Sequence, residues 1–194
     1  MKLNLDNANF YSVELTDPAH ENELGPLKIL AEKALRDFGI KPIDVETVSH
    51  SQNTTLRVDS SNGCFILRIS RPGHQSAENI QSEIIFLLAL IDSGFGVPCP
   101  WQGRLVIASV PEVPEPHCTV LFSWLEGRSF RSGLTPTQAY LVGKTIAKMH
   151  QFSRSWSPPD DFDRQPVHKW AYESIDDNKV RSYLVTIEDL KLLE

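Results

Sequence analysis

The segment CFILRI at residues 64–69 decides the fold. It is a short apolar run, typical of a buried strand, and it carries a single cation near its end. Strand alternation puts Ile66 and Arg68 on one face of this predicted strand. Further along, the predicted helix at residues 77–93 carries Glu83 in its apolar stripe. An unpaired buried charge is costly, so we expect Arg68 and Glu83 to pair. The alternative is a glutamate at the edge of the stripe that extends to water.

Short polar turns separate this strand from further strands on either side. The turn before it ends in an Asn-Gly pair, which favours a hairpin. A proline-rich stretch at residues 111–116 is expected to be a loop, because proline donates no ladder hydrogen bond. The pattern predicts an α+β fold, with a helix between the third and fourth strands of a five-stranded antiparallel sheet. The predicted strands are residues 45–48, 55–58, 64–69, 105–108 and 118–125.

The chain divides into three predicted regions. Residues 1–42 are expected to form a polar arm and then a packing helix that begins at Pro26. Residues 43–125 form the lobe that holds the sheet, and residues 126–194 leave it to form helices. The apolar segment at residues 187–193 has nothing to cover it, so we expect it to pack against missing sequence or to mediate self-association.

Composition narrows the classes of function. The 194 residues carry a formal net charge of −6 and no basic cluster interleaved with aromatics, which argues against a nucleic-acid partner. Cys64, Cys99 and Cys118 share no metal-ligand spacing and are expected to be buried, reduced thiols. The chain has neither an apolar leader nor a run long enough to span a membrane. We therefore expect a cytoplasmic protein without a membrane partner.

Three motifs, in this order, resemble those of the aminoglycoside phosphotransferase family, which includes choline and homoserine kinases. Residues 65–69 resemble the family's third strand, VLFSWLEG at residues 120–127 resembles its hinge, and LVGKTIAKMH at residues 141–150 resembles a helix of its second lobe. The resemblance covers residues 43–155. It implies a protein-kinase-like small lobe followed by an incomplete helical lobe.

The resemblance also implies an ATP site. Arg68 falls where a cation meets the nucleotide phosphates, Glu83 where an acid orients that cation, and Ile66 against the face of the adenine. Two departures from the family pattern stand out: the loop at residues 49–54 has no glycine, and arginine replaces the commoner lysine. The remaining implied nucleotide ligands are Ser51, Gln52 and Asn53 over the phosphates, and the Ser123 C=O and Leu125 N–H at the adenine edge.

No catalytic residue is assigned in this chain. The family's His-Gly-Asp loop, whose acid accepts the proton of the acceptor hydroxyl, has no match, and neither has the aspartate that binds Mg²⁺. The acidic run at residues 160–163 follows the LVGKTIAKMH helix too closely and is expected to be a solvated turn. Mg²⁺ is thus expected for a complete family enzyme, without ligands here, and the chain alone is expected to be inactive.

Three functions remain open. The first is the ATP-binding portion of a phosphotransferase that acts on a hydroxyl of a metabolite or aminoglycoside-like acceptor, in a shortened chain. The second is a non-catalytic nucleotide-binding or protein-interaction module with a kinase-like sheet. The third is an α+β domain in which the Arg68–Glu83 pair is only structural. The sequence leaves the acceptor unidentified.

Overall fold

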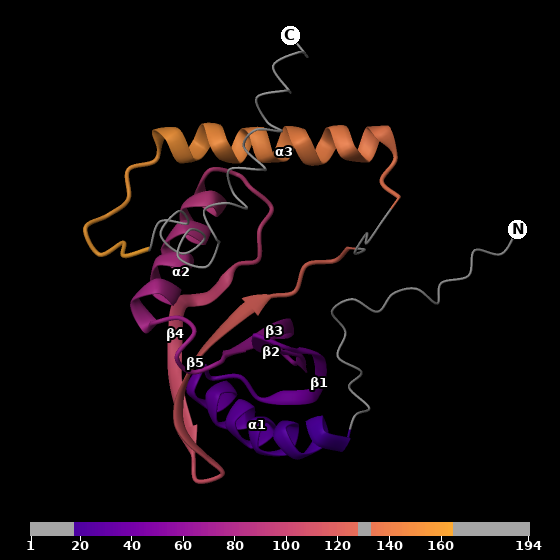
Figure 1. The fold of residues 1–194 in the computed structure, drawn as a ribbon, viewed down its shortest axis with the longest axis vertical. Coiled ribbons are helices and arrows are strands. Elements are labelled where there is room, and N and C mark those ends of the chain that lie inside the picture. Colours follow the sequence, from indigo (N-terminus) through magenta and orange to yellow (C-terminus); the bar gives the residue numbers. More distant parts are fainter. Residues whose placement is uncertain (1–17, 128–132, 165–194) are drawn as a thin grey trace, which may run out of the picture. The chain divides into compact units, whose positions relative to one another are not determined.

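The computed structural model describes residues 18–127 and 133–164. The chain divides into two units, Met1–Phe162 and Asp163–Glu194, and the described helices and strands lie in the first. In chain order these are α1 (Pro18–Asp37), β1 (Pro42–His50), β2 (Asn53–Ser60), β3 (Gly63–Ser70), α2 (Ala77–Asp92), β4 (Pro100–Val110), β5 (Val113–Ser123) and α3 (Pro136–Ser155) (Figure 1).

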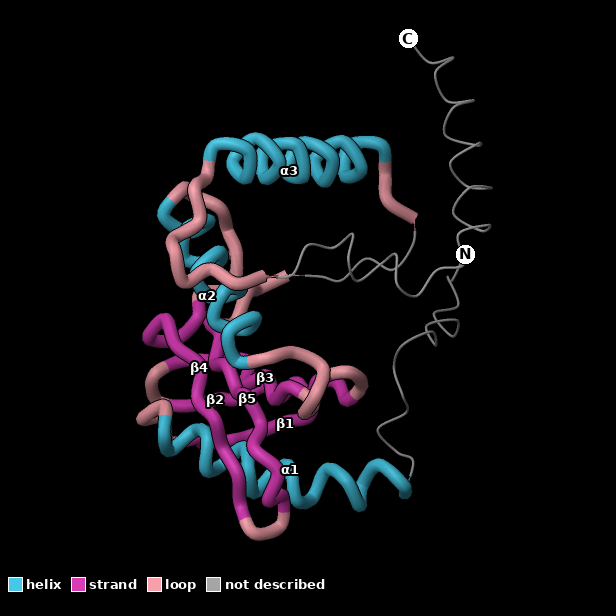
Figure 2. Tube along the Cα trace, turned by 60° about the vertical axis from the view of Figure 1, so that its left-hand side comes forward, coloured by secondary structure: helices cyan, strands magenta, loops and turns pink. Residues whose placement is uncertain are grey.

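The strands form one antiparallel sheet, drawn in magenta in Figure 2. Strand pairing gives the order β1-β2-β3-β5-β4. Helix α2 lies between β3 and β4 in the chain, so the predicted five-stranded α+β fold is confirmed. Gly63 begins β3 with φ 121°, a conformation that side chains other than glycine's rarely adopt. β3, which contains the CFILRI segment, is the middle strand and pairs with β2 on one side and β5 on the other.

Two segments are more regular than the sequence predicted. Pro26 lies inside α1 and does not begin it. Leu24 is buried, so the apolar face of the helix continues upstream of the proline and favours the longer helix. β5 begins at Val113, so most of the expected proline loop is strand. The β4–β5 register shifts between Ala108 and Val110, and prolines are tolerated beside such an irregularity.

The sheet has one face closed by α1. Leu56, Leu67 and Leu121, from the three middle strands, form a continuous core with the apolar stripe of α1. On the opposite face, α2 packs over β5 and β4 and forms a smaller core around Ile84 and Phe122. The face that α2 covers is therefore only partly closed, and its β2 side carries side chains that α2 does not bury.

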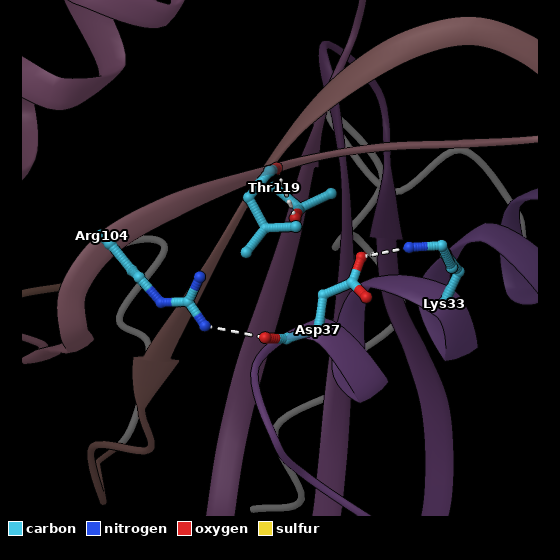
Figure 3. Close-up of polar contacts among 5 residues, drawn as sticks. Lys33, Asp37, Arg104 and Thr119 are labelled. Atoms are coloured by element: carbon cyan, nitrogen blue, oxygen red, sulfur yellow. Dashed lines mark hydrogen bonds and ion pairs between the residues drawn. The ribbon is translucent and has the colours of Figure 1, made fainter.

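Polar contacts fix the end of α1 on the sheet. Arg104 of β4 donates from Nη2 to the Asp37 carbonyl at 2.7 Å, and its guanidinium lies 5.4 Å from the centre of the Phe38 ring. The Asp37 side chain pairs with Lys33 one helical turn earlier (Figure 3). A cation beside the last carbonyls of a helix satisfies an unpaired acceptor and opposes the negative end of the helix dipole. These contacts hold α1 in position from β4.

Helix α3 begins at a capping box formed by Thr135 and Gln138. Thr135 Oγ1 accepts from the Gln138 N–H at 3.3 Å, and Gln138 Oε1 accepts from the Thr135 N–H at 2.9 Å, which completes a capping box. None of the side chains of α3 is buried among the described residues. Near its end, the rings of Phe152 and Trp156 lie 6.0 and 5.0 Å from the ring of Phe86 on α2.

All three cysteines are free thiols. Cys64 and Cys118 are half-buried within β3 and β5. Cys99 is exposed, so the expectation that it is buried was wrong. It lies just before β4, outside both cores, which is why solvent reaches it.

Candidate functional site

Arg68 and Glu83 form the pair that the sequence predicted. Arg68 Nη1 donates to Glu83 Oε1 and Arg68 Nη2 to Glu83 Oε2, each at 2.8 Å. The side chains are 19% and 23% exposed, so the alternative of a glutamate that extends to water is wrong. A bidentate, charge-assisted pair of this kind fixes the orientation of the guanidinium plane. Helix α2 supplies the carboxylate, and its start is fixed by Ser76, whose Oγ accepts from the Asn79 N–H.

Arg68 has hydrogen-bond donors that Glu83 does not use. A guanidinium has five N–H donors, of which Glu83 takes two. The Nε of Arg68 is buried without a hydrogen-bond partner among the described residues. The Phe122 ring lies 5.1 Å from the guanidinium carbon and closes its β5 side. Arg68 is therefore an oriented cation with unused donors on a partly open sheet face.

The loop at residues 51–53 lies beside the Arg68 end of β3. Strand register pairs Asn53 with Ser70, two residues beyond Arg68, and the Ser51 N–H donates to the Asn53 carbonyl at 3.1 Å. This tight turn lines a cavity of about 190 Å³. The cavity is also lined by Leu27, Ile69 and His117, from α1 and the strands it covers. That Ser51, Gln52 and Asn53 bind phosphates stays a prediction.

At the end of β5, backbone hydrogen bonds join the predicted hinge to β3 on one side and to the residue before β4 on the other. The Trp124 N–H donates to the Cys64 carbonyl of β3 at 3.2 Å, and the Ser123 N–H donates to the Cys99 carbonyl at 2.8 Å. The Ser123 hydroxyl accepts from the Cys99 N–H at 2.9 Å. The segment that contains Ser123 and Leu125 is thus fixed at its first residue, and the adenine contacts of both residues stay predictions.

A second group of polar residues lies at the hinge end of the same sheet face, and the sequence reasoning missed it. Arg57 Nη2 donates to Asp59 Oδ1 at 3.2 Å, and the guanidinium carbon lies 4.9 Å from the centre of a Trp124 ring. Trp124 Nε1 in turn donates to Glu126 Oε1 at 3.0 Å. Hydrogen bonding from the Cys64 thiol, and next from Arg57, lowers the pKa of Asp59. Arg57 and Trp124 are far apart in the sequence and meet only through strand register, so no local motif marks their contact.

The register places the side chains of this face in rows across three strands. Cross-strand partners share a face, so each row runs from β2 through β3 to β5. Ile66, which is partly buried against the α2 core, lies in the middle row, and Arg68 lies next to it along β3. The rows are Thr55, Arg68 and Val120; Arg57, Ile66 and Phe122; and Asp59, Cys64 and Trp124.

The described residues bring no metal ligands together. Within residues 18–127 and 133–164, no group of three or more histidine, cysteine or acidic side chains is arranged to hold a metal ion. Asp160 and Asp161 are exposed, and the Phe162 N–H closes their turn on the Pro159 carbonyl at 3.0 Å. In the same residues, no helix is long and apolar enough to cross a membrane.

The five-stranded sheet, the inserted helix α2 and the Arg68–Glu83 pair have the arrangement of a protein-kinase-like small lobe. The chain belongs to the phosphotransferase enzyme family (APH), whose family model matches residues 44–192. An uncharacterized protein of Deinococcus radiodurans is 26% identical over 144 residues, which cover 73% of this chain and 41% of that protein.

Two solved structures share the fold. A microcompartment-associated aminopropanol kinase superposes with a TM-score of 0.60 at 26% identity, over 72% of this chain and 44% of the kinase. An amicoumacin kinase in complex with AMP-PNP, Ca²⁺ and Ami superposes with a TM-score of 0.60 at 17% identity, over 90% of this chain and 57% of the kinase. The chain thus spans about half the length of the relatives it matches.

Proposed function

We propose that this chain is the nucleotide-binding part of a small-molecule phosphotransferase, which transfers the γ-phosphoryl group of ATP to a hydroxyl of its acceptor. The observation that carries the proposal is the Arg68–Glu83 pair, because it presents an oriented cation on a sheet face that α2 leaves partly open. ATP fits this surface, since its phosphates match the unused guanidinium donors. ATP, when bound, supplies the transferable phosphoryl group.

Each residue near the pair has a separate role in this proposal. Glu83 holds the guanidinium of Arg68 so that it does not reorient when the phosphates arrive, which is the preorganisation that phosphoryl transfer uses. Ile66 offers the adenine an apolar surface one row away from Arg68. The Ser123 carbonyl and Leu125 N–H supply one acceptor and one donor for the adenine edge, and the turn at residues 51–53 covers the phosphates.

The acceptor is proposed only as a class. The two kinases with solved structures are named for aminopropanol and amicoumacin, and the former contains a hydroxyl group. We place the acceptor of this chain among small hydroxyl-bearing molecules. The second candidate is a nucleotide-binding module without catalysis, because the sequence has no match to the family's His-Gly-Asp loop.

Calorimetry with the 194-residue chain tests the nucleotide site. ADP with Mg²⁺ should bind the wild type, and Arg68→Ala should weaken binding about 10- to 100-fold, since a charge-assisted hydrogen bond contributes about 1.5–3 kcal/mol. Arg36→Ala is the matched control, because Arg36 is an exposed cation in the last turn of α1. Absence of ADP binding to the wild type would overturn both nucleotide functions.

A phosphoryl-transfer assay separates the two candidates from a complete enzyme. We expect no turnover of ATP with aminoalcohol or aminoglycoside acceptors by this chain, since its sequence lacks the His-Gly-Asp loop. Measured turnover that is lost in Arg68→Ala would show instead that a catalytic acid exists in the chain.

A further inference from the structure

Arg57 is a second cation on the sheet face of Arg68, and nothing in the proposed function uses it. It lies opposite Ile66 in the β2–β3 register, whereas Arg68 lies opposite Thr55. Leu56 and Val58, on either side of Arg57, are buried in the α1 core, so the Arg57 side chain faces away from α1. Its side chain is 40% exposed, against 19% for Arg68. A ligand on this face can therefore reach Arg57.

The two arginines are held by different partners on this face. Arg68 is held by Glu83 of α2, beside the β3 end that neighbours the turn at residues 51–53. Arg57 is held 4.9 Å from the Trp124 ring, in the segment that follows β5. Arg68 thus starts from the row nearer the turn at residues 51–53, and the guanidinium of Arg57 lies near the expected hinge.

The contact between Arg57 and Trp124 passes over β3. Neighbouring strands lie about 4.8 Å apart, so side chains from β2 and from the end of β5 can meet only above the strand between them. The Trp124 N–H bonds to the Cys64 carbonyl, which puts Cys64 in the same row as Trp124. Arg57 therefore extends above Cys64, directly beside Ile66, the residue proposed to contact adenine.

The charges around Arg57 disfavour a phosphate there. Asp59 accepts a hydrogen bond from its guanidinium, and Glu46 is its cross-strand neighbour on β1. Glu126, bonded to Trp124, adds a third carboxylate at this end. These acids repel an anion but do not repel a neutral ring, which can stack on the face of the guanidinium turned away from Trp124.

We propose that Arg57 is a further nucleotide-contacting residue and that it binds the base end of the nucleotide, while Arg68 serves the phosphates. This inference rests on the proposed nucleotide site. Trp124 and Asp59 position the guanidinium beside Ile66, and the purine stacks against Ile66 and the guanidinium together. The nucleotide then lies along β3, with its charged and neutral ends matched to two differently placed cations.

Calorimetry with two ligands tests this division of roles. ADP contains both ends of the nucleotide, and inorganic tripolyphosphate contains only the charged one. Arg57→Gln should weaken ADP binding about fivefold to tenfold, the range expected for loss of a cation–π contact, and should leave tripolyphosphate binding unchanged. Arg68→Gln should weaken both ligands, and Arg36→Gln, the exposed control on α1, should affect neither.

The outcomes separate this inference from the proposed function. Equal weakening of ADP and tripolyphosphate by Arg57→Gln would overturn it, because Arg57 would then be a phosphate ligand. Unchanged or tighter ADP binding would also overturn it, since no favourable base contact would exist. If the glutamine variant does not fold, Arg57→Lys keeps the charge but loses the planar group, and the same selective loss for ADP is expected. Failure of the wild type to bind either ligand would instead reject the nucleotide site itself.

Discussion

The two faces of the sheet are built from the same strands, but only one of them is closed. On the α1 face, alternate residues of β2, β3 and β5 join a continuous apolar core. On the α2 face, four buried residues form a small core, and the neighbouring positions hold Arg57 and Arg68 with their partners. The two faces therefore differ in role: the α1 face holds most of the apolar core, and the α2 face presents two oriented arginine side chains.

The largest effect is expected on the closed face. Leu67→Ala should lower the free energy of unfolding by about 2–5 kcal/mol, because its side chain is fully buried and the surrounding core cannot collapse into the space. Urea denaturation followed by circular dichroism measures the change. Ile107→Ala, at a 57% exposed position of β4, should stay within about 0.5 kcal/mol of wild type. Similar losses for the two variants would contradict a core centred on the α1 face.

A smaller loss of stability is expected when Arg68, on the open face, loses the carboxylate that pairs with it. Glu83→Ala should lower the free energy of unfolding by about 1–3 kcal/mol, because Arg68 keeps its charge in a site where its side chain is 19% exposed. The same denaturation experiment applies. Lys33→Ala removes an exposed pair of α1 and should cost about 0.5 kcal/mol or less. If Glu83→Ala were no more destabilising than Lys33→Ala, the pair would contribute nothing to stability.

The contact that docks α1 on β4 should have a modest effect. Arg104→Ala removes the 2.7 Å hydrogen bond to the Asp37 carbonyl and should cost about 0.5–1.5 kcal/mol. Thermal unfolding of the variant is compared with that of Arg36→Ala, which removes another exposed cation without this bond. Matching transitions for the two variants would mean that the contact does not hold the helix.

The smallest effect concerns pH at the hinge end of the open face. Asp59 has a folded-state pKa below its ordinary value, through hydrogen bonds from Cys64 and Arg57. A depressed carboxyl pKa adds stability above the unfolded-state pKa, and this stability is lost as the pH falls through the folded-state pKa. Urea midpoints measured from about pH 6 down to pH 3 should therefore fall slightly less for Asp59→Asn than for wild type. A steeper fall for the variant would contradict a lowered pKa of Asp59 in the folded protein.

The parts of the fold that depend on local sequence signals could be predicted. Asn62 and Gly63 marked the hairpin, the apolar stripe of residues 77–93 marked α2, and the need to pair a buried cation linked Arg68 to Glu83. The hairpin and α2 are each specified by residues within the same short segment of sequence. The Arg68–Glu83 pair could be predicted because the buried cation has one evident partner.

The failures have a shared physical cause, because tertiary contacts outweighed a local rule. Proline signals placed the start of α1 too late and the start of β5 too late, since burial of Leu24 and pairing with β4 extend both elements. Arg57 and Trp124 are far apart in the sequence and meet only over β3. Their contact requires the strand register, which no single segment encodes.

The alternation along β3 limits how the length of this segment can change in evolution. Loss of one codon within β3 would turn the residues beyond it over, so that Arg68 would face the α1 core and Leu67 would face α2. Loss or gain of two codons preserves the parity of the strand and moves each side chain along its own face. In homologous sequences we therefore expect length changes here in even steps, or an odd step accompanied by a bulge that restores the parity.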